Sequence, residues 1–99
     1  MGFADEQSYE EMIAALNRYI SEVEAQCDIM CKAGEDCVDN TEDDPAAIAS
    51  KEKIEGHVKK IKAELETVGK VIRALQDEIE RIRAEAKKAA QDESKEEKA

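Results

Sequence analysis

Aromatic residues are scarce in this chain of 99 residues: there is no tryptophan, and aromatic side chains make up 3 % of the sequence. A large globular core needs more bulky apolar side chains than this, whereas a narrow seam between helices does not. Charged residues, in contrast, account for 40 % of the chain. The composition therefore favours a narrow helical assembly over a large globular core.

Residues that break or turn the chain are also few. Pro45 is the only proline, and there are four glycines. Few turns are therefore available, and a chain of this length forms one domain at most. We expect a small number of long elements.

Cysteine is sparse and odd in number, with Cys27, Cys31 and Cys37. An odd, sparse set does not form a disulfide framework, so a reducing cytoplasm is expected. No apolar run approaches the roughly 20 residues that a membrane span needs. The first six residues lack the basic and apolar regions of a cleavable signal peptide. The sequence thus predicts no membrane span, and a protein that is cytoplasmic or is secreted without a cleavable signal.

Basic residues are rare in the first half of the chain, and the net charge is −10. Residues 1–45 contain 2 basic and 13 acidic residues, which gives −11, while residues 46–99 contain 13 basic and 12 acidic residues, which gives +1. Binding to nucleic acid through counterion release is disfavoured, because it needs clustered Lys and Arg. The first half of the chain would repel a copy of itself but tolerate the second half.

One stretch of the second half carries an uninterrupted heptad pattern. Its apolar residues recur at steps of three and four, which is the a/d pattern of a helical seam. The members are Val58, Ile61, Leu65, Val68, Ile72, Leu75, Ile79, Ile82 and Ala86.

A second seam lies in the first half of the chain. It predicts a helix over about 8–38, with Ser8 as the N-cap of a capping box that includes Glu11. Asp5 is an alternative cap one turn earlier. The seam consists of Tyr9, Ile13, Leu16, Ile20, Val23, Cys27, Met30, Gly34 and Cys37.

The only convincing break between the two seams is the acidic stretch 39–44. Asp44 is suited to cap a second helix and Pro45 to occupy its first position, so this helix is predicted over about 45–90. Residues 1–7 and 91–99 have no apolar periodicity and are expected to be flexible. Two seams joined by a short turn predict an antiparallel helical hairpin.

The register of the hairpin follows from the spacing of the seams. If paired residue numbers sum to about 84–85, apolar residues face each other in every layer; Cys27, for example, faces Val58. Phe3 could extend the pairing to Ile82. The predicted interface consists of Ile13, Leu16, Ile20, Val23, Val58, Ile61, Leu65, Val68, Ile72, Leu75, Ile79 and Ile82.

Apolar residues also flank the seams at Met12, Tyr19 and Val71. The second helix is longer than the first, which leaves Ile79, Ile82 and Ala86 short of cover. This stripe is wider than a two-stranded coiled coil uses. The predicted fold class is therefore all-α: an antiparallel two-helix coiled-coil hairpin that dimerises into a four-helix bundle.

Three residues raise the possibility of a metal site. Cys27 and Cys31 share one helix face, and His57 neighbours Val58, the predicted partner of Cys27. Two thiolates and an imidazole are plausible ligands of zinc or copper. The favoured alternative is that Cys27 fills the seam, Cys31 flanks it and His57 lies at the surface. The sequence therefore predicts no metal and no cofactor, with these three residues as the candidates.

No constellation indicates an enzyme. The seams contain no Glu, so the carboxylate-lined core of a di-iron bundle is not predicted. A Cys–His nucleophilic pair would lack an orienting group and a concave pocket.

The layout over residues 8–90 resembles the WxG helical-hairpin family of type VII secretion in length, acidic charge and paired antiparallel helices. The resemblance implies a helical-hairpin dimer that travels as a folded substrate or as the partner of a larger toxin. Two motifs of that family are missing: there is no tryptophan for the Trp-x-Gly turn, and no tyrosine follows Tyr19 to form the carboxy-terminal Tyr-x-x-x-Asp/Glu signature.

Three functions are thus predicted from the sequence. The first is a non-enzymatic interaction protein that self-associates as a homodimer or packs on the helices of a protein partner. The second is a WxG-like substrate or co-secreted partner of a type VII secretion system. The third is a small metal-binding bundle.

Overall fold

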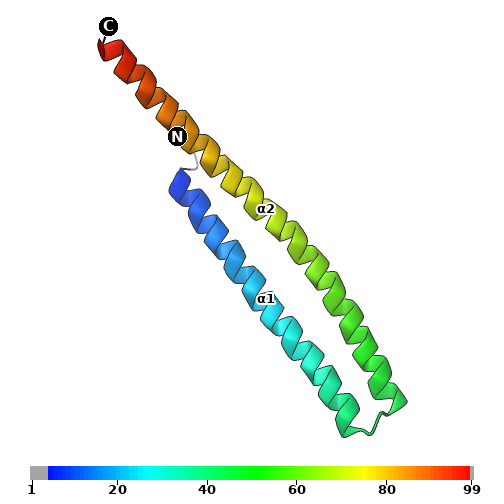
Figure 1. Ribbon diagram of the computed structural model, residues 1–99. Helices are drawn as coiled ribbons and strands as arrows, with labels where there is room; N and C mark the ends of the chain where they lie inside the picture. Colours follow the sequence, from blue (N-terminus) through cyan, green and yellow to red (C-terminus); the bar gives the residue numbers. More distant parts are fainter. Residues whose placement is uncertain (1–4, 99) are drawn as a thin grey trace.

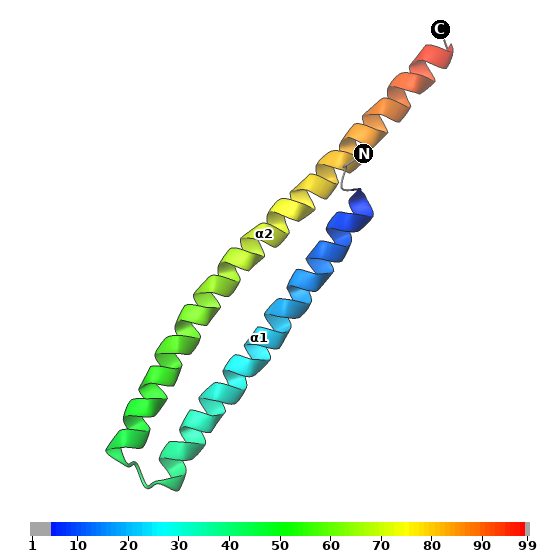
Figure 2. The ribbon, with the colours of Figure 1, turned by 180° about the vertical axis from the view of Figure 1, so that it is seen from behind.

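The computed structural model describes residues 5–98, with side chains described through residue 92. Two helices, α1 (Glu6–Asn40) and α2 (Pro45–Lys98), lie side by side and antiparallel (Figures 1 and 2). The molecule is a rod with extents of 83 × 22 × 16 Å. The predicted all-α helical hairpin is confirmed. The predictions for residues 1–4 and 99, including the packing of Phe3, lie outside the described residues.

Helix α1 begins at the earlier of the two predicted caps. Asp5 is the N-cap, and its carboxylate accepts a hydrogen bond of 2.8 Å from the backbone N–H of Ser8. The prediction of Ser8 as the cap is therefore wrong. Starting at Asp5 places Glu6 in the first turn, where a carboxylate interacts favourably with the helix dipole. The earlier start also brings Glu6 within reach of Arg83 on α2.

The Asp5 cap makes the start of α1 sensitive to acid. The pKa of Asp5 lies below the ordinary value of 3.8 because the Ser8 N–H donates to its ionised carboxylate. A lowered pKa in the folded state stabilises the cap above the ordinary pKa, and this stabilisation is lost as the pH falls through the lowered value. We predict that the amide resonance of Ser8 titrates with a midpoint below 3.8, measured by NMR. The Asp5→Asn variant is the control without titration, and a midpoint at or above the ordinary value contradicts the assigned cap.

The turn between the helices contains no glycine, yet two of its residues adopt left-handed backbone. Glu42 has a φ of 54° and Asp43 a φ of 63°. The N–H of Asp43 donates to the carbonyl of Val38 at 3.1 Å, which is the long hydrogen bond of a Schellman motif. Thr41 adds a hydrogen bond of 2.8 Å from its hydroxyl to the carbonyl of Cys37. These bonds satisfy carbonyl groups at the end of α1.

Helix α2 begins at Pro45 because Asp44 caps it. The Asp44 carboxylate accepts hydrogen bonds from the backbone N–H groups of Ala46 at 2.8 Å and Ala47 at 3.4 Å. The helix continues to Lys98, so the prediction of a helix that ends at about residue 90 is wrong. Residues 70–98 contain neither glycine nor proline and are rich in Ala, Glu and Lys, which favour helix without tertiary contacts.

The core is a thin layer between the helices. Only a few hydrophobic side chains of the described residues are buried, and most of these belong to α2. The buried hydrophobic residues are Cys27, Ala47, Val58, Leu65, Ile72 and Ile79. Ile79, which was expected to be short of cover, is buried with 6 % of its surface exposed, because α1 begins earlier than predicted.

The seam of α1 drifts toward its end. Cys37, predicted on the seam, is exposed, whereas Val38 is half-buried. A straight α-helix drifts by about 20° per heptad relative to a repeat of 3.5 residues per turn. After four heptads the next residue along therefore faces α2 in place of Cys37.

Gly34 lies buried on the seam, and a methyl group there would find space. A Cβ at this position would lie 3.5 Å from Ile54 Cδ1 and 3.5 Å from Lys51 Cγ, which is ordinary van der Waals contact. We predict that Gly34→Ala raises the free energy of unfolding by about 1 kcal/mol, through helix propensity. Urea unfolding measures the effect, and Gly56→Ala is the control, because nothing lies within 4 Å of its added Cβ. If Gly34→Ala lowered the free energy of unfolding while Gly56→Ala did not, the packing described for Gly34 on the seam would be contradicted.

Candidate interaction surface

The seam consists of two rows of side chains, which differ in burial on α2. The a positions of α2 form the first row and are buried, whereas its d positions form the second row and are half-buried. Around an α-helix the d position lies next to the g position, and the a position lies next to the e position. The second row therefore lies toward the side of the hairpin where the g positions of the two helices face each other. The seam therefore opens toward this side. The first row is Val58, Leu65, Ile72 and Ile79, and the second is Ile54, Ile61, Val68, Leu75 and Ile82.

One side of the hairpin, which we name the charged flank, is formed by the e positions of both helices and includes Glu10, Glu24, Lys62 and Arg83. Arg83 reaches from α2 to α1, where it pairs with Glu6 and, at 3.2 Å between Nη2 and Oε1, with Glu10. These ion pairs connect the two helices at the end of the hairpin away from the turn.

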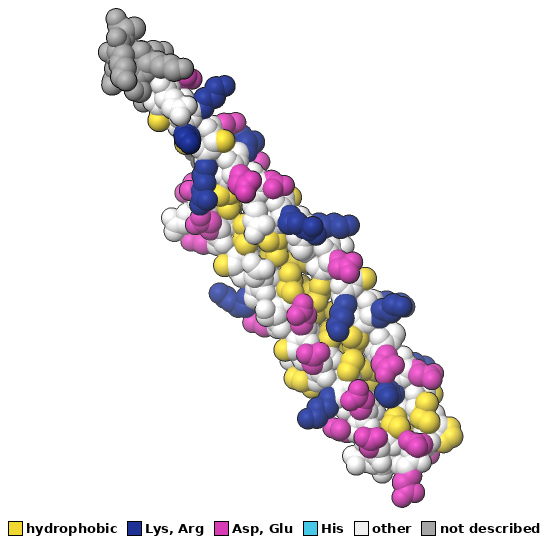
Figure 3. All heavy atoms as spheres, in the orientation of Figure 1, with side chains coloured by type: hydrophobic (Ala, Val, Ile, Leu, Met, Phe, Trp, Pro, Cys, Tyr) yellow, Lys and Arg dark blue, Asp and Glu magenta, His cyan; other side chains and the backbone are white. Residues whose placement is uncertain are grey.

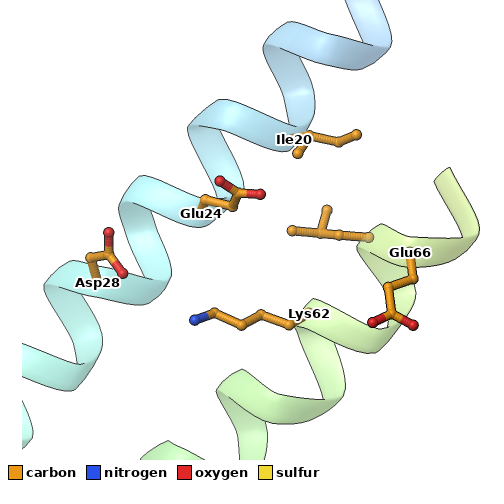
Figure 4. A pocket seen from close by; sticks show the side chains of 6 residues that line it. Ile20, Glu24, Asp28, Lys62 and Glu66 are labelled. Atoms are coloured by element: carbon orange, nitrogen blue, oxygen red, sulfur yellow. The ribbon is translucent and has the colours of Figure 1, made fainter. Parts of the chain in front are cut away.

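A shallow hollow on the charged flank has apolar residues at its base and charged residues at its edges. Ile20 on α1 and Leu65 on α2 are paired seam residues, and the side chain of Lys62 extends toward α1 (Figure 4). Glu24, Asp28 and Glu66 complete the lining. Figure 3 likewise shows a hydrophobic strip between the helices with acidic and basic side chains along both edges. Charged side chains border the buried row on this flank.

The opposite side, which we name the apolar flank, is formed by the g positions and includes Met12, Tyr19 and Val71. These three side chains are 50 %, 51 % and 46 % exposed. Beside them a second hollow is lined by the half-buried residues Val23, Met30 and Ile61, together with Tyr19, Glu22, Gln26 and Cys27. Exposed apolar side chains thus continue into the half-buried row of the seam. The apolar flank is the candidate functional site.

Acidic residues also occur on the apolar flank, and one of them is paired. Glu78 is half-buried, and Arg81 donates to its carboxylate at 3.0 Å through Nε. The pKa of Glu78 is lowered, first because of this hydrogen bonding from Arg81. Arg81 also pairs with Glu85 at 2.6 Å, and these two acids raise the pKa of Arg81, with Glu78 the larger cause. The pairing offsets the charge of Glu78 next to the second row.

The structure places the predicted interface residues along the line where the helices meet. Those on α1 are half-buried, and those on α2 alternate between buried and half-buried. Sequence reasoning missed Ile29 and Ile48, which are 61 % and 38 % exposed. Neither lies on a seam, so heptad spacing carries no signal for them.

The three metal candidates do not converge. Cys27 is buried, Cys31 lies at an e position and His57 lies exposed at a g position. The e and g positions border opposite sides of an antiparallel pair, so Cys31 and His57 lie on different flanks. Among the described residues, no group of three or more His, Cys, Asp or Glu side chains is arranged to hold a metal ion. The alternative in which these three side chains converge is therefore wrong, whereas Cys27 lies in the seam as the favoured interpretation expects.

Comparison with known proteins gives no match: no family model, curated protein or solved structure matches this chain. The resemblance to the WxG hairpins thus stays a prediction from sequence layout. Neither helix, over its described residues, has a stretch both long and apolar enough to cross a membrane.

Proposed function

We propose that this protein is a non-enzymatic interaction module that binds helices of a protein partner through the apolar flank, and that its first partner is a second copy of the same chain. The observation that carries the proposal is the incomplete burial of the seam toward Met12, Tyr19 and Val71. A helix that uses a, d and g positions for burial is typical of a four-helix bundle rather than a two-stranded coil. Two hairpins that meet at this flank complete such a bundle.

The hydrophobic effect favours this association. Removing apolar surface from water contributes about 25 cal/mol per Å². The second row and the exposed g residues retain apolar surface that a single hairpin has no further element to cover. A facing copy supplies the same surface in return, which is the self-complementary contact of a two-fold dimer.

The face of the rod that carries the apolar flank has the size that a stable dimer needs. Helix α1 has 35 residues, which corresponds to about 52 Å of helix at 1.5 Å per residue. The molecule is 22 Å wide, so the two-helix part offers a face of about 1,100 Å². Specific interfaces bury about 800 Å² per partner.

Sedimentation equilibrium of the full chain tests the proposal. We expect a reversible dimer with twice the chain mass of 11.0 kDa at micromolar concentration. A helical, cooperatively folding monomer at all concentrations up to the millimolar range would overturn self-association as the function. Binding of an unrelated protein by that monomer would show that the partner is not a second copy.

A further inference from the structure

We infer that the apolar flank is a site of oxidation by hydrogen peroxide and related hydroperoxides, and that conversion of Met12 to its sulfoxide dissociates the dimer. This inference rests on the proposed function, because it concerns the regulation of the interface that the apolar flank forms. The peroxide is the only co-reactant.

Sulfur-containing side chains are concentrated on and beside the apolar flank. Of the three methionines in the chain, the structure describes the side chains of Met12 and Met30. Met12 lies on the flank and is 50 % exposed, while Met30 lines the hollow beside it together with Cys27. Both described methionines therefore belong to the surface that the proposed dimer covers.

Exposure distinguishes Met12 from the other sulfur atoms of this surface. Met30 is half-buried, and Cys27 is 1 % exposed. Cys31 is only partly exposed and lies at an e position on the charged flank. Because oxidation of sulfur side chains follows their exposure to solvent, Met12 reacts before Met30 and Cys27 in the single hairpin.

The reaction is a two-electron transfer of oxygen. The thioether sulfur of Met12 attacks one oxygen of the peroxide, so that an S–O bond forms and the O–O bond breaks. The proton of the transferred oxygen moves to the departing hydroxide, which leaves as water. The sulfur is thereby oxidised by two electrons and the peroxide is reduced by two. The product carries a polar S–O group on a side chain that was apolar.

The sulfoxide destabilises the dimer more than the hairpin. In the single hairpin Met12 is half exposed, so water solvates the new S–O group. In the dimer Met12 lies against apolar side chains of the second copy, where a polar group loses its solvation. A two-fold dimer contains this side chain twice, so the cost of desolvation arises twice.

Dimer formation in turn protects Met12 from the peroxide. The second copy covers the apolar flank, so the oxidant reaches Met12 only in the dissociated hairpin. By mass action, the rate of oxidation then follows the fraction of free hairpin. Oxidation and association therefore exclude each other.

Peroxide treatment of the full chain tests the inference. Tandem mass spectrometry measures the sulfoxide at each methionine, sedimentation velocity over a dilution series gives the dissociation constant, and circular dichroism gives the helix content. Met12→Leu removes the reactive sulfur and keeps an apolar side chain of similar volume. Met30→Leu is the matched control, and both variants keep the three cysteines. Methionine sulfoxide reductase then reverses the modification.

After treatment, wild type and Met30→Leu are expected to dimerise at least tenfold more weakly with unchanged helix content, because the sulfoxide is desolvated in the dimer. The reductase is expected to restore the dimer, and Met12→Leu is expected to keep its affinity throughout. In wild type, oxidation of Met12 is expected to be about tenfold slower at about 100 times the dissociation constant than at about one tenth of it.

An unchanged dissociation constant with Met12 fully oxidised would overturn the inference while leaving self-association intact. Equal weakening of the Met12→Leu dimer, or loss of helix together with the dimer, would overturn it as well. A monomer before any treatment would overturn both proposals.

Discussion

Replacing Ile72 by aspartate is expected to abolish cooperative folding of the hairpin at 25 °C. Ile72 is 7 % exposed in the middle of the first seam row, so the substitution removes a buried apolar side chain and places a carboxylate where no partner exists. Burial of an unpaired charge costs several kcal/mol, and losing the isoleucine adds about 2–5 kcal/mol. Natural domains have only about 5–15 kcal/mol of stability in total.

Circular dichroism at 222 nm during urea unfolding measures this effect. The matched control is Ile29→Asp, because the same side chain is there 61 % exposed, and its stability is expected to stay within about 0.5 kcal/mol of wild type. Equal loss of helix in the two variants would contradict the assignment of the seam.

Replacing Tyr19 and Val71 together by lysine is expected to weaken the dimer at least 100-fold without unfolding the hairpin. Both side chains are about half exposed, so the single hairpin accommodates lysine at low cost. In the dimer, both lysines would replace apolar contacts between the copies and would lose contact with water. The two substitutions also reduce the net charge of −10, so increased repulsion between acidic chains cannot explain the dissociation.

Sedimentation velocity over a dilution series gives the dissociation constant, and circular dichroism checks the helix content. Ala14→Lys/Ile48→Lys is the matched control, since it makes the same change in charge at exposed positions on the other side of the hairpin. If both double variants dimerise as wild type does, the apolar flank is not the interface.

Heptad spacing predicts most of this fold because a narrow seam is a local, periodic property of the sequence. Val58, Leu65 and Ile72 recur every seven residues and so specify which face of α2 is buried. This holds for any conformation of the turn. Asp44 and Pro45 likewise specify the start of α2 through their own backbone chemistry.

The start of α1 and the backbone of the turn could not be predicted, because each depends on a choice between local conformations that the sequence allows equally. Asp5 and Ser8 both suit an N-cap, and the start at Asp5 adds the turn that carries the Glu6–Arg83 pair. The left-handed backbone of Glu42 and Asp43 occurs without the glycine that usually marks it, so composition gives no signal. This left-handed backbone instead depends on closure of the hairpin with the seams of α1 and α2 in register.

The candidate site is partly readable from the sequence. Met12, Tyr19 and Val71 stand out as apolar residues beside the seams, but their shared flank follows only from assigning each to a g position in an antiparallel pair. The same assignment separates Cys31 from His57. Spacing along one helix therefore predicts which residues are neighbours on that helix. Predicting which residues are neighbours across the hairpin also requires the direction of the second helix.

A methyl NMR dilution series tests the central claim most directly, with isoleucine δ1 and methionine ε labels. Met12, Met30 and Ile61 lie on or beside the apolar flank, whereas Ile48 and Ile79 lie toward the charged flank. We predict that dilution from millimolar to submicromolar concentration shifts the first three resonances and leaves the other two unchanged. Shifts confined to Ile48 and Ile79, or no change at any of the five, would contradict the claim that the apolar flank binds a second hairpin.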